Sequence, residues 1–191
     1  MAKQTYTTNT TGGAWTTLVS GECTVAAIAA NSTVAATLVS LRITLNGGTF
    51  SYILPLNTLP LNSPARLAVG GISLKTGDKI EAMSSTAVDW VTTVVTGAAY
   101  RSVIVTAPST DTWTTLIAGP ATVRAMFVSS NSGGNVGIRL HKASTDFSIV
   151  LSEALDVGTS KRLMSPVVLA TGESLQVKGT ETAYWIATGV E

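Results

Sequence analysis

The stretch WTTLVSGECTV (residues 15–25) returns later in the chain as WTTLIAGPATV (residues 113–123). Trp15 then lies over Trp113 at an offset of 98 residues (113 − 15), and seven of the eleven positions are identical. A repeat this long and this dense is the mark of an internal duplication, which has to be recognised before any local pattern is interpreted.

The offset shrinks in small steps further along the chain, and Trp90 lies over Trp185 at 95 (185 − 90). Loops change length more readily than the elements they connect, so a duplicated domain is expected to drift in this way. The repeat is also longer than the unit of most solenoid proteins. We therefore predict two tandem domains, residues 1–98 and 99–191, joined by a short segment at 98–100.

Within each copy the local pattern is that of β-strands. TLVSLRITL (37–45) and FSYILPL (50–56) are rich in apolar and β-branched residues, and the NGG between them favours a tight hairpin turn. Each copy offers about eight short strands with turn residues between them, which is typical of β-sandwiches and jelly rolls. The predicted fold is all-β, with two tandem duplicated β-sandwich, jelly-roll-like domains.

The composition narrows the classes of function. Only 12% of residues are charged and the formal net charge is +1, so the clustered basic residues that bind nucleic acid are not expected. The uncharged run 23–41 is interrupted by Asn31, Ser32 and Thr33, a turn signal that argues against a membrane span. The N-terminus has no apolar segment of a secretory signal peptide, and TYTTNTTGGA (5–14) predicts an extended arm on a neighbour or a disordered segment.

The tryptophans form two matched pairs, and each position has two interpretations. They could form an aromatic platform for sugars, or they could fill the cores of the two sandwiches, because burying an aromatic ring removes a large apolar surface from water. The same placement in both copies favours the second interpretation. The predicted core residues are Trp15, Trp90, Trp113 and Trp185.

Residues able to carry chemistry are few. Asp78 and Glu173 stand in matched turns, where a carboxylate beside glycine usually accepts a local backbone hydrogen bond rather than binding a metal. His141, Ser144 and Asp146 are the residue types of a catalytic triad, but they lie in a stretch that we interpret as a solvated loop.

The single Cys23 has Ala121 at the matching position, so we expect it to pack in the core rather than to react. We therefore predict no catalytic residue, no metal ligand and no cofactor.

Four arginines also fall into matched pairs. Arg42 matches Arg139, and Arg66 matches Arg162. They are candidates for a domain seam or a contact with a neighbouring subunit, and the alternative is ordinary surface placement.

Small, weakly charged, Thr-rich tandem β-sandwiches resemble accessory virion proteins of tailed bacteriophages, such as head decoration, neck and tail-associated proteins. The turn LKTGDKI (74–80), with its copy ATGESL (170–175), is similar to the turn before a late strand in jelly rolls of the tumour-necrosis-factor-like type. The resemblance implies a non-enzymatic structural protein of the virion, made in the host cytoplasm. Its partners would be further copies of itself and other virion proteins, without nucleic acid or membrane. The alternatives are a carbohydrate-binding adhesin or receptor-binding tail component, which would bind glycan, and a glycan-degrading enzyme, for which no obvious acid pair is present.

Overall fold

The computed structural model describes residues 2–59, 65–67, 71–97, 100–107, 110–143, 145–163 and 166–191. At residues 65–67 and 151 it describes the backbone alone. The residues of the predicted joint at 98–99 and Ser144 lie outside the described residues. Among the described residues, no helix is long and apolar enough to cross a membrane.

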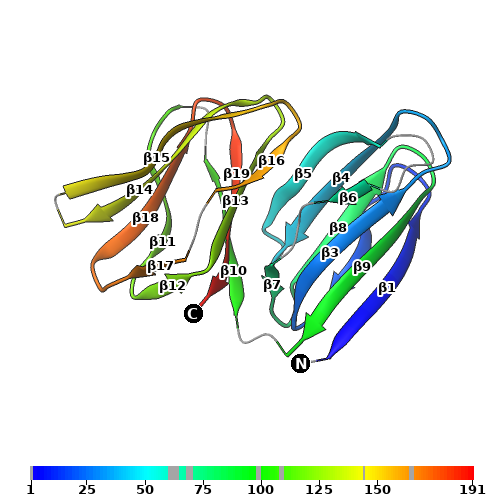
Figure 1. The fold of residues 1–191 in the computed structure, drawn as a ribbon, viewed down its shortest axis with the longest axis horizontal. Helices are drawn as coiled ribbons and strands as arrows, with labels where there is room; N and C mark the ends of the chain where they lie inside the picture. The colour runs from blue at the N-terminus through cyan, green and yellow to red at the C-terminus, as the bar shows by residue number, and fades with distance from the viewer. Residues whose placement is uncertain are drawn as a thin grey trace. The chain divides into compact units, whose positions relative to one another are not determined.

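The chain divides into two compact units. Unit 1 comprises Met1–Phe50 and Leu54–Tyr100, and unit 2 comprises Ser51–Ile53 and Arg101–Glu191. Both are β-sandwiches, coloured blue to green and green to red in Figure 1. The predicted all-β fold with two tandem sandwiches is confirmed.

The two sheets of unit 1 take up alternate segments of the chain. The first sheet has the order β1-β9-β3-β6, with β7 pairing β3, and the second has the order β2-β8-β4-β5. Because the chain crosses between the sheets and its first strand pairs with its last, this is the jelly-roll arrangement. The strands are β1 (Lys3–Thr10), β2 (Thr16–Ser20), β3 (Cys23–Asn31), β4 (Thr37–Thr44), β5 (Phe50–Leu59), β6 (Ala65–Leu67), β7 (Ile72–Leu74), β8 (Lys79–Ser84) and β9 (Val88–Thr96).

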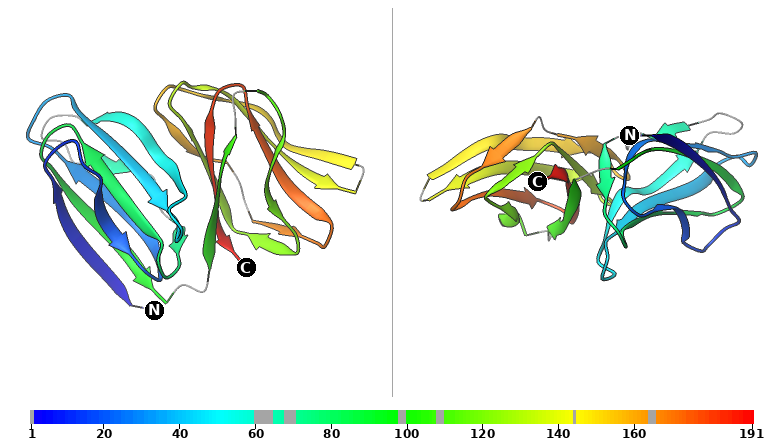
Figure 2. Two further views of the ribbon diagram at one scale, coloured as in Figure 1. Left: turned by 180° about the vertical axis from the view of Figure 1, so that it is seen from behind. Right: turned by 90° about the horizontal axis from the view of Figure 1, so that it is seen from below.

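Unit 2 repeats this order. Its sheets are β10-β19-β13-β16 and β11-β18-β14-β15, with a short ladder β12-β17 beside them. Figure 2 shows the strands of both units from behind and from below. The strands are β10 (Arg101–Ala107), β11 (Thr114–Ala118), β12 (Ala121–Val123), β13 (Ala125–Ser130), β14 (Gly134–Lys142), β15 (Thr145–Leu155), β16 (Ser160–Arg162), β17 (Val167–Leu169), β18 (Glu173–Gly179) and β19 (Ala183–Val190).

The N-terminal segment is neither an arm on a neighbour nor disordered. Residues Lys3–Thr10 form β1, which pairs with β9 from Lys3↔Val95 to Thr10↔Val88 without a register shift. Its threonines are β-branched and polar, which suits a strand at an exposed sheet edge, so the polar composition indicates an edge strand.

The predicted turn at NGG closes the hairpin between β4 and β5. Gly47 and Gly48 have φ angles of 105° and 87°, which side chains with a Cβ rarely adopt. The Leu45 amide donates to the Thr49 carbonyl at 2.8 Å, so the two strands meet directly after the turn.

Alternation along the strands forms the core of each unit. In β4, Val39, Leu41 and Ile43 are fully buried between the sheets, whereas Leu38 and Arg42 point outward. Trp90 and Trp185 fill the same place in the two cores, at 1% and 0% exposure. The Trp90 Nε1 donates to Thr10 Oγ1 at 2.9 Å, whereas Trp185 Nε1 has no hydrogen-bond partner among the described residues.

Candidate functional site

The outer face of the sheet β2-β8-β4-β5 carries an aromatic ring covered by an arginine. The Arg42 guanidinium carbon lies 4.2 Å from the centre of the Trp15 ring and 5.0 Å from that of Phe50. Trp15 is half-buried, so the prediction that it fills the core is wrong. The physical reason is strand alternation. Thr16 pairs with the buried Ala82, which places the preceding residue on the outer face.

A buried carboxylate holds this arginine in place. Glu81, at 4% exposure, accepts hydrogen bonds from Arg42 Nε at 2.9 Å, Thr44 Oγ1 at 2.6 Å and Lys79 Nζ at 2.7 Å. Burial by itself raises the pKa of Glu81, but the hydrogen bonds from Lys79, Thr44 and Arg42 outweigh it and lower the pKa to about 2. The carboxylate is therefore ionised at neutral pH and fixes the guanidinium over the ring.

In unit 2 an arginine again lies over a tryptophan ring, an arrangement called the stack below, but a different residue holds the arginine in place. Arg139 lies 4.5 Å from the centre of the Trp113 ring, and Lys178 Nζ lies 5.2 Å from it. Arg139 Nε donates to Gln176 Oε1 at 2.8 Å, in the place of Glu81, and its Nη1 pairs with Asp146 at 2.5 Å. Trp113 is also half-buried on an outer face, so the core prediction is wrong for this residue as well.

A hollow lies beside each stack, at equivalent positions of the two units. In unit 1 it is lined by Gly13, Leu38, Val39, Ser40, Leu56, Met83, Ser84 and Ser85. In unit 2 it is lined by Asp111, Asn135, Val136, Ser152, Lys178 and Thr180. At the offsets of the repeat, Leu38 corresponds to Asn135 and Met83 to Lys178. One ancestral hollow has therefore become apolar in unit 1 and polar in unit 2, where Lys178 pairs with Asp111 at 2.8 Å.

The apolar hollow opens on an exposed apolar surface. Leu38 and Leu56, which line the hollow, have exposed fractions of 38% and 53%. Phe50, which lies beside Arg42 further along the sheet, is 42% exposed. The sequence analysis did not single out these residues or Met83. The signal was available, because Leu38 takes an outward position between core residues in the alternation of β4.

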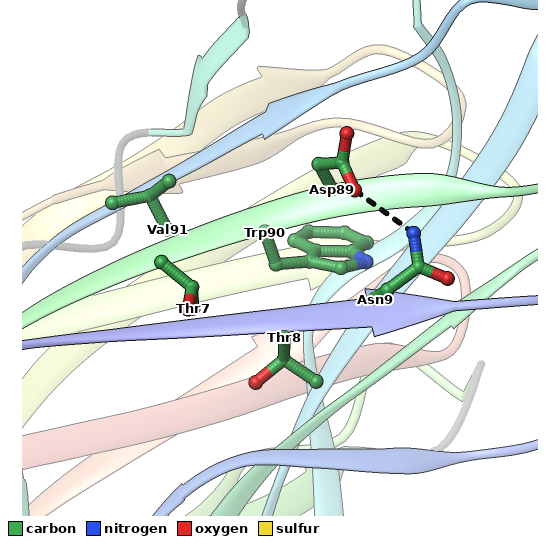
Figure 3. Close-up of a pocket in the computed structure, with 6 residues that line it drawn as sticks. All are labelled: Thr7, Thr8, Asn9, Asp89, Trp90 and Val91. Atoms are coloured by element: carbon green, nitrogen blue, oxygen red, sulfur yellow. Dashed lines mark hydrogen bonds between the residues drawn. The ribbon is translucent and has the colours of Figure 1, made fainter.

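A shallow depression on the other sheet of unit 1 follows the β1–β9 pair (Figure 3). Asn9 Nδ2 donates to Asp89 Oδ1 at 2.8 Å across it, and Thr7 and Val91 stand nearby. The Trp90 ring lies beneath and is 1% exposed, so its face is not available to stack on a sugar.

The matched turn carboxylates hold the backbone, as expected. Asp78 accepts the amides of Asn46 at 2.8 Å and Lys75 at 2.9 Å. Glu173 accepts the Ala170 amide at 2.9 Å and pairs with Lys142, and these hydrogen bonds, led by that from Lys142, lower its pKa. Within the described ranges, no group of three or more His, Cys, Asp and Glu side chains is placed to hold a metal ion.

The stretch predicted to be a loop lies in the hairpin formed by β14 and β15. His141 ends β14 together with Lys142, and Asp146 belongs to β15, so these residues are accessible to solvent as predicted but lie in paired strands rather than in a loop. His141 Nδ1 lies 2.7 Å from Asp146 Oδ1, while Ser144 lies outside the described residues. The histidine and the carboxylate thus belong to the network that anchors Arg139.

The remaining candidate residues are separate from the stacks. Cys23 is buried in β3, and burial raises the pKa of its thiol, as expected for a packing residue. Arg162 is exposed in β16. Arg66 lies in β6, opposite Ala29, and its side chain lies outside the described residues.

No protein-family model and no curated protein sequence matches the chain. Solved structures with similar folds include the major capsid protein P2 of bacteriophage PM2, at 10% identity and a TM-score of 0.44, covering 99% of this chain and 97% of that one. The exported protein XepA of PBSX shows 8% identity and a TM-score of 0.36, covering 100% and 86%. The tandem CBM22 domains of Xyn10C from Paenibacillus barcinonensis show 10% identity and a TM-score of 0.30, covering 99% and 91%. The similarity is distant and structural.

Proposed function

We propose that this chain is a non-enzymatic structural protein of a virus particle. It decorates or stabilises a bacteriophage capsid, neck or tail as an oligomer in contact with other virion proteins. The observation that carries the proposal is the apolar hollow of unit 1, whose lining includes the exposed side chains of Leu38 and Leu56.

A grouped apolar surface of this kind is a mark of protein–protein contact, because a monomer leaves it exposed to water at a cost in free energy. The low charge of the chain points the same way, since fewer ionic groups lose their hydration when a large surface is covered. Placement on a virus particle is supported by the jelly-roll architecture, which viral capsid proteins use widely. It is also supported by the low charge and high threonine content of the sequence, which resemble those of accessory virion proteins of tailed bacteriophages.

The function is tested first on the particle. Mass spectrometry of purified particles from the phage or prophage that encodes the chain should detect it in a fixed ratio to the major capsid or tail protein. Absence from the particles, with the chain free in the lysate, would contradict the proposal.

A matched pair of variants then tests the surface. Leu38→Asn gives unit 1 the residue of unit 2 and should weaken the affinity of the chain for the particle about tenfold, a loss of about 1.4 kcal/mol of binding free energy. Asn135→Ser, at the equivalent position, should leave it unchanged. Equal effects of the two variants, or glycan-array binding that Leu38→Asn does not alter, would favour the adhesin alternative.

A further inference from the structure

The two equivalent hollows differ in what they can bind. The hollow of unit 1 has no charged residue in its described lining, and Leu38, Leu56 and Met83 supply its apolar walls. In unit 2 the ion pair between Asp111 and Lys178 lies in the same place. An apolar group gains free energy by entering the first hollow, whereas in the second it would desolvate a charged pair.

Unit 2 carries a protruding apolar group of the right kind. Val157 stands in the turn between β15 and β16 and is 72% exposed. The turn is held by the Gly158 amide donating to Ser130 O at 3.1 Å and by the Thr159 hydroxyl donating to Asp156 O at 2.8 Å. A side chain on a turn fixed in this way loses little conformational entropy on binding.

The charges beside the two features are complementary. Ser40 lines the hollow, and Arg42 lies two residues further along the same face of β4. Arg42 and Lys79 share the single carboxylate of Glu81, so the cluster that begins with Arg42 beside the hollow carries a net positive charge. Asp156, next to Val157, is exposed and supplies a negative charge beside the turn.

We infer that the hollow of unit 1 receives the Val157 turn from a second copy of this chain. The inference rests on the proposed function and specifies one of its oligomeric contacts. Because the two surfaces are different, the contact is head-to-tail, so copies form a closed ring or continue along a lattice.

Disulfide trapping tests this contact between copies. Cys23 is buried at 3% exposure, so cysteines introduced at exposed positions are the ones that oxidise readily. Chains with Leu56→Cys and chains with Val157→Cys are mixed, oxidised and run on a non-reducing gel. We expect a cross-linked dimer in the mixture, about tenfold more than in either chain alone, and a ladder of multimers from the double variant.

Val168→Cys is the matched control, since Val168 is 73% exposed in unit 2. Its mixture with Leu56→Cys should give about tenfold less dimer than the Val157→Cys mixture. Equal yields, or a double variant that closes within one chain, would overturn the inference.

Light scattering of the unmodified chain distinguishes failure of the inferred contact from failure of the proposed function. An oligomer without the Val157–Leu56 cross-link overturns the inference and leaves the proposed function standing. A monomer of 19.6 kDa at all concentrations, absent also from purified particles, overturns both.

Discussion

Unit 1 and unit 2 hold the same arginine over the same tryptophan by different means. In unit 1 the anchor is the buried Glu81 in the middle of the sheet, with Thr44 and Lys79 around it. In unit 2 the middle position is the neutral Gln176, and the carboxylate is the exposed Asp146 at the β14–β15 hairpin. The geometry of the stack is the same in both units, whereas the carboxylate is buried in unit 1 and lies at the exposed edge in unit 2.

The largest effect is expected where the cores differ. Trp90→Phe removes ring atoms and leaves Thr10 Oγ1 without its indole donor, so the free energy of unfolding should fall by about 2–4 kcal/mol. Trp185→Phe removes an indole N–H that has no partner among the described residues, and it should cost about 1 kcal/mol less. Urea unfolding followed by circular dichroism measures both, and equal losses would show that the hydrogen bond is immaterial.

Exchanging Glu81 and Gln176, the residues that hold the two arginines, should also change the free energy of unfolding unequally in the two units. Glu81→Gln leaves Arg42 and Lys79 without their shared carboxylate and should lower the free energy of unfolding by about 1–3 kcal/mol. Gln176→Glu adds a charge beside an arginine that already pairs with Asp146, so a change of less than about 0.5 kcal/mol is expected. Equal losses of unfolding free energy for the two exchanges, measured by urea titration at neutral pH, would show that the buried Glu81 contributes no more to stability than Gln176.

The pH dependence of stability should report on the buried carboxylate of Glu81 in unit 1. The pKa of Glu81 is about 2 in the folded chain, against an ordinary value of 4.5, so its stabilisation is complete above pH 4.5 and is lost as the pH falls toward 2. The stability difference between the wild type and Glu81→Gln should therefore shrink over this range. Urea midpoints at pH 6, 4 and 3 are the measurement, and a difference that stays constant would contradict the lowered pKa.

The smallest effect is expected at the ion pair in the hollow of unit 2. Asp111 is 54% exposed and Lys178 is 23% exposed, so solvent screens their attraction. Asp111→Asn should change the free energy of unfolding by less than about 0.5 kcal/mol. A loss several times larger in thermal unfolding would mean that the pair fixes the neighbouring strands.

The two β-sandwiches could be predicted from the sequence because the internal duplication and the alternation of apolar residues along the strands both indicate them. The two copies of WTTL point to equivalent strands, and NGG gives the hairpin directly. The faces of Trp15 and Trp113 could not be predicted in the same way. Each stands just before its strand, and the residue it faces belongs to a strand distant in the sequence.

The hollow of unit 1 could not be predicted from the sequence for a related reason. Its walls come from Gly13, Leu38, Leu56 and Met83, which belong to four separate segments. Their proximity depends on the register of three strands, and a one-residue slip would turn any of them to the other face. The hairpin at 141–146 was misjudged because its polar residues look like a loop, although Arg139, His141 and Asp146 pair across strands on an exposed face.

The pairing of β1 with β9 has a consequence for synthesis. Lys3 pairs with Val95, so β1 leaves the ribosome well before β9 and stays unpaired until nearly the whole of unit 1 has been made. Contacts this distant in the chain form slowly, and an unpaired strand edge is prone to wrong association during the delay. β1 consists of polar residues and one tyrosine, with threonine at half of its positions and a lysine at its start, so it forms a strand readily but attracts apolar surfaces weakly. The tandem arrangement shortens the time for which this strand edge is unpaired. Each unit pairs its first strand with its own last strand, so unit 1 can fold before unit 2 has been synthesised.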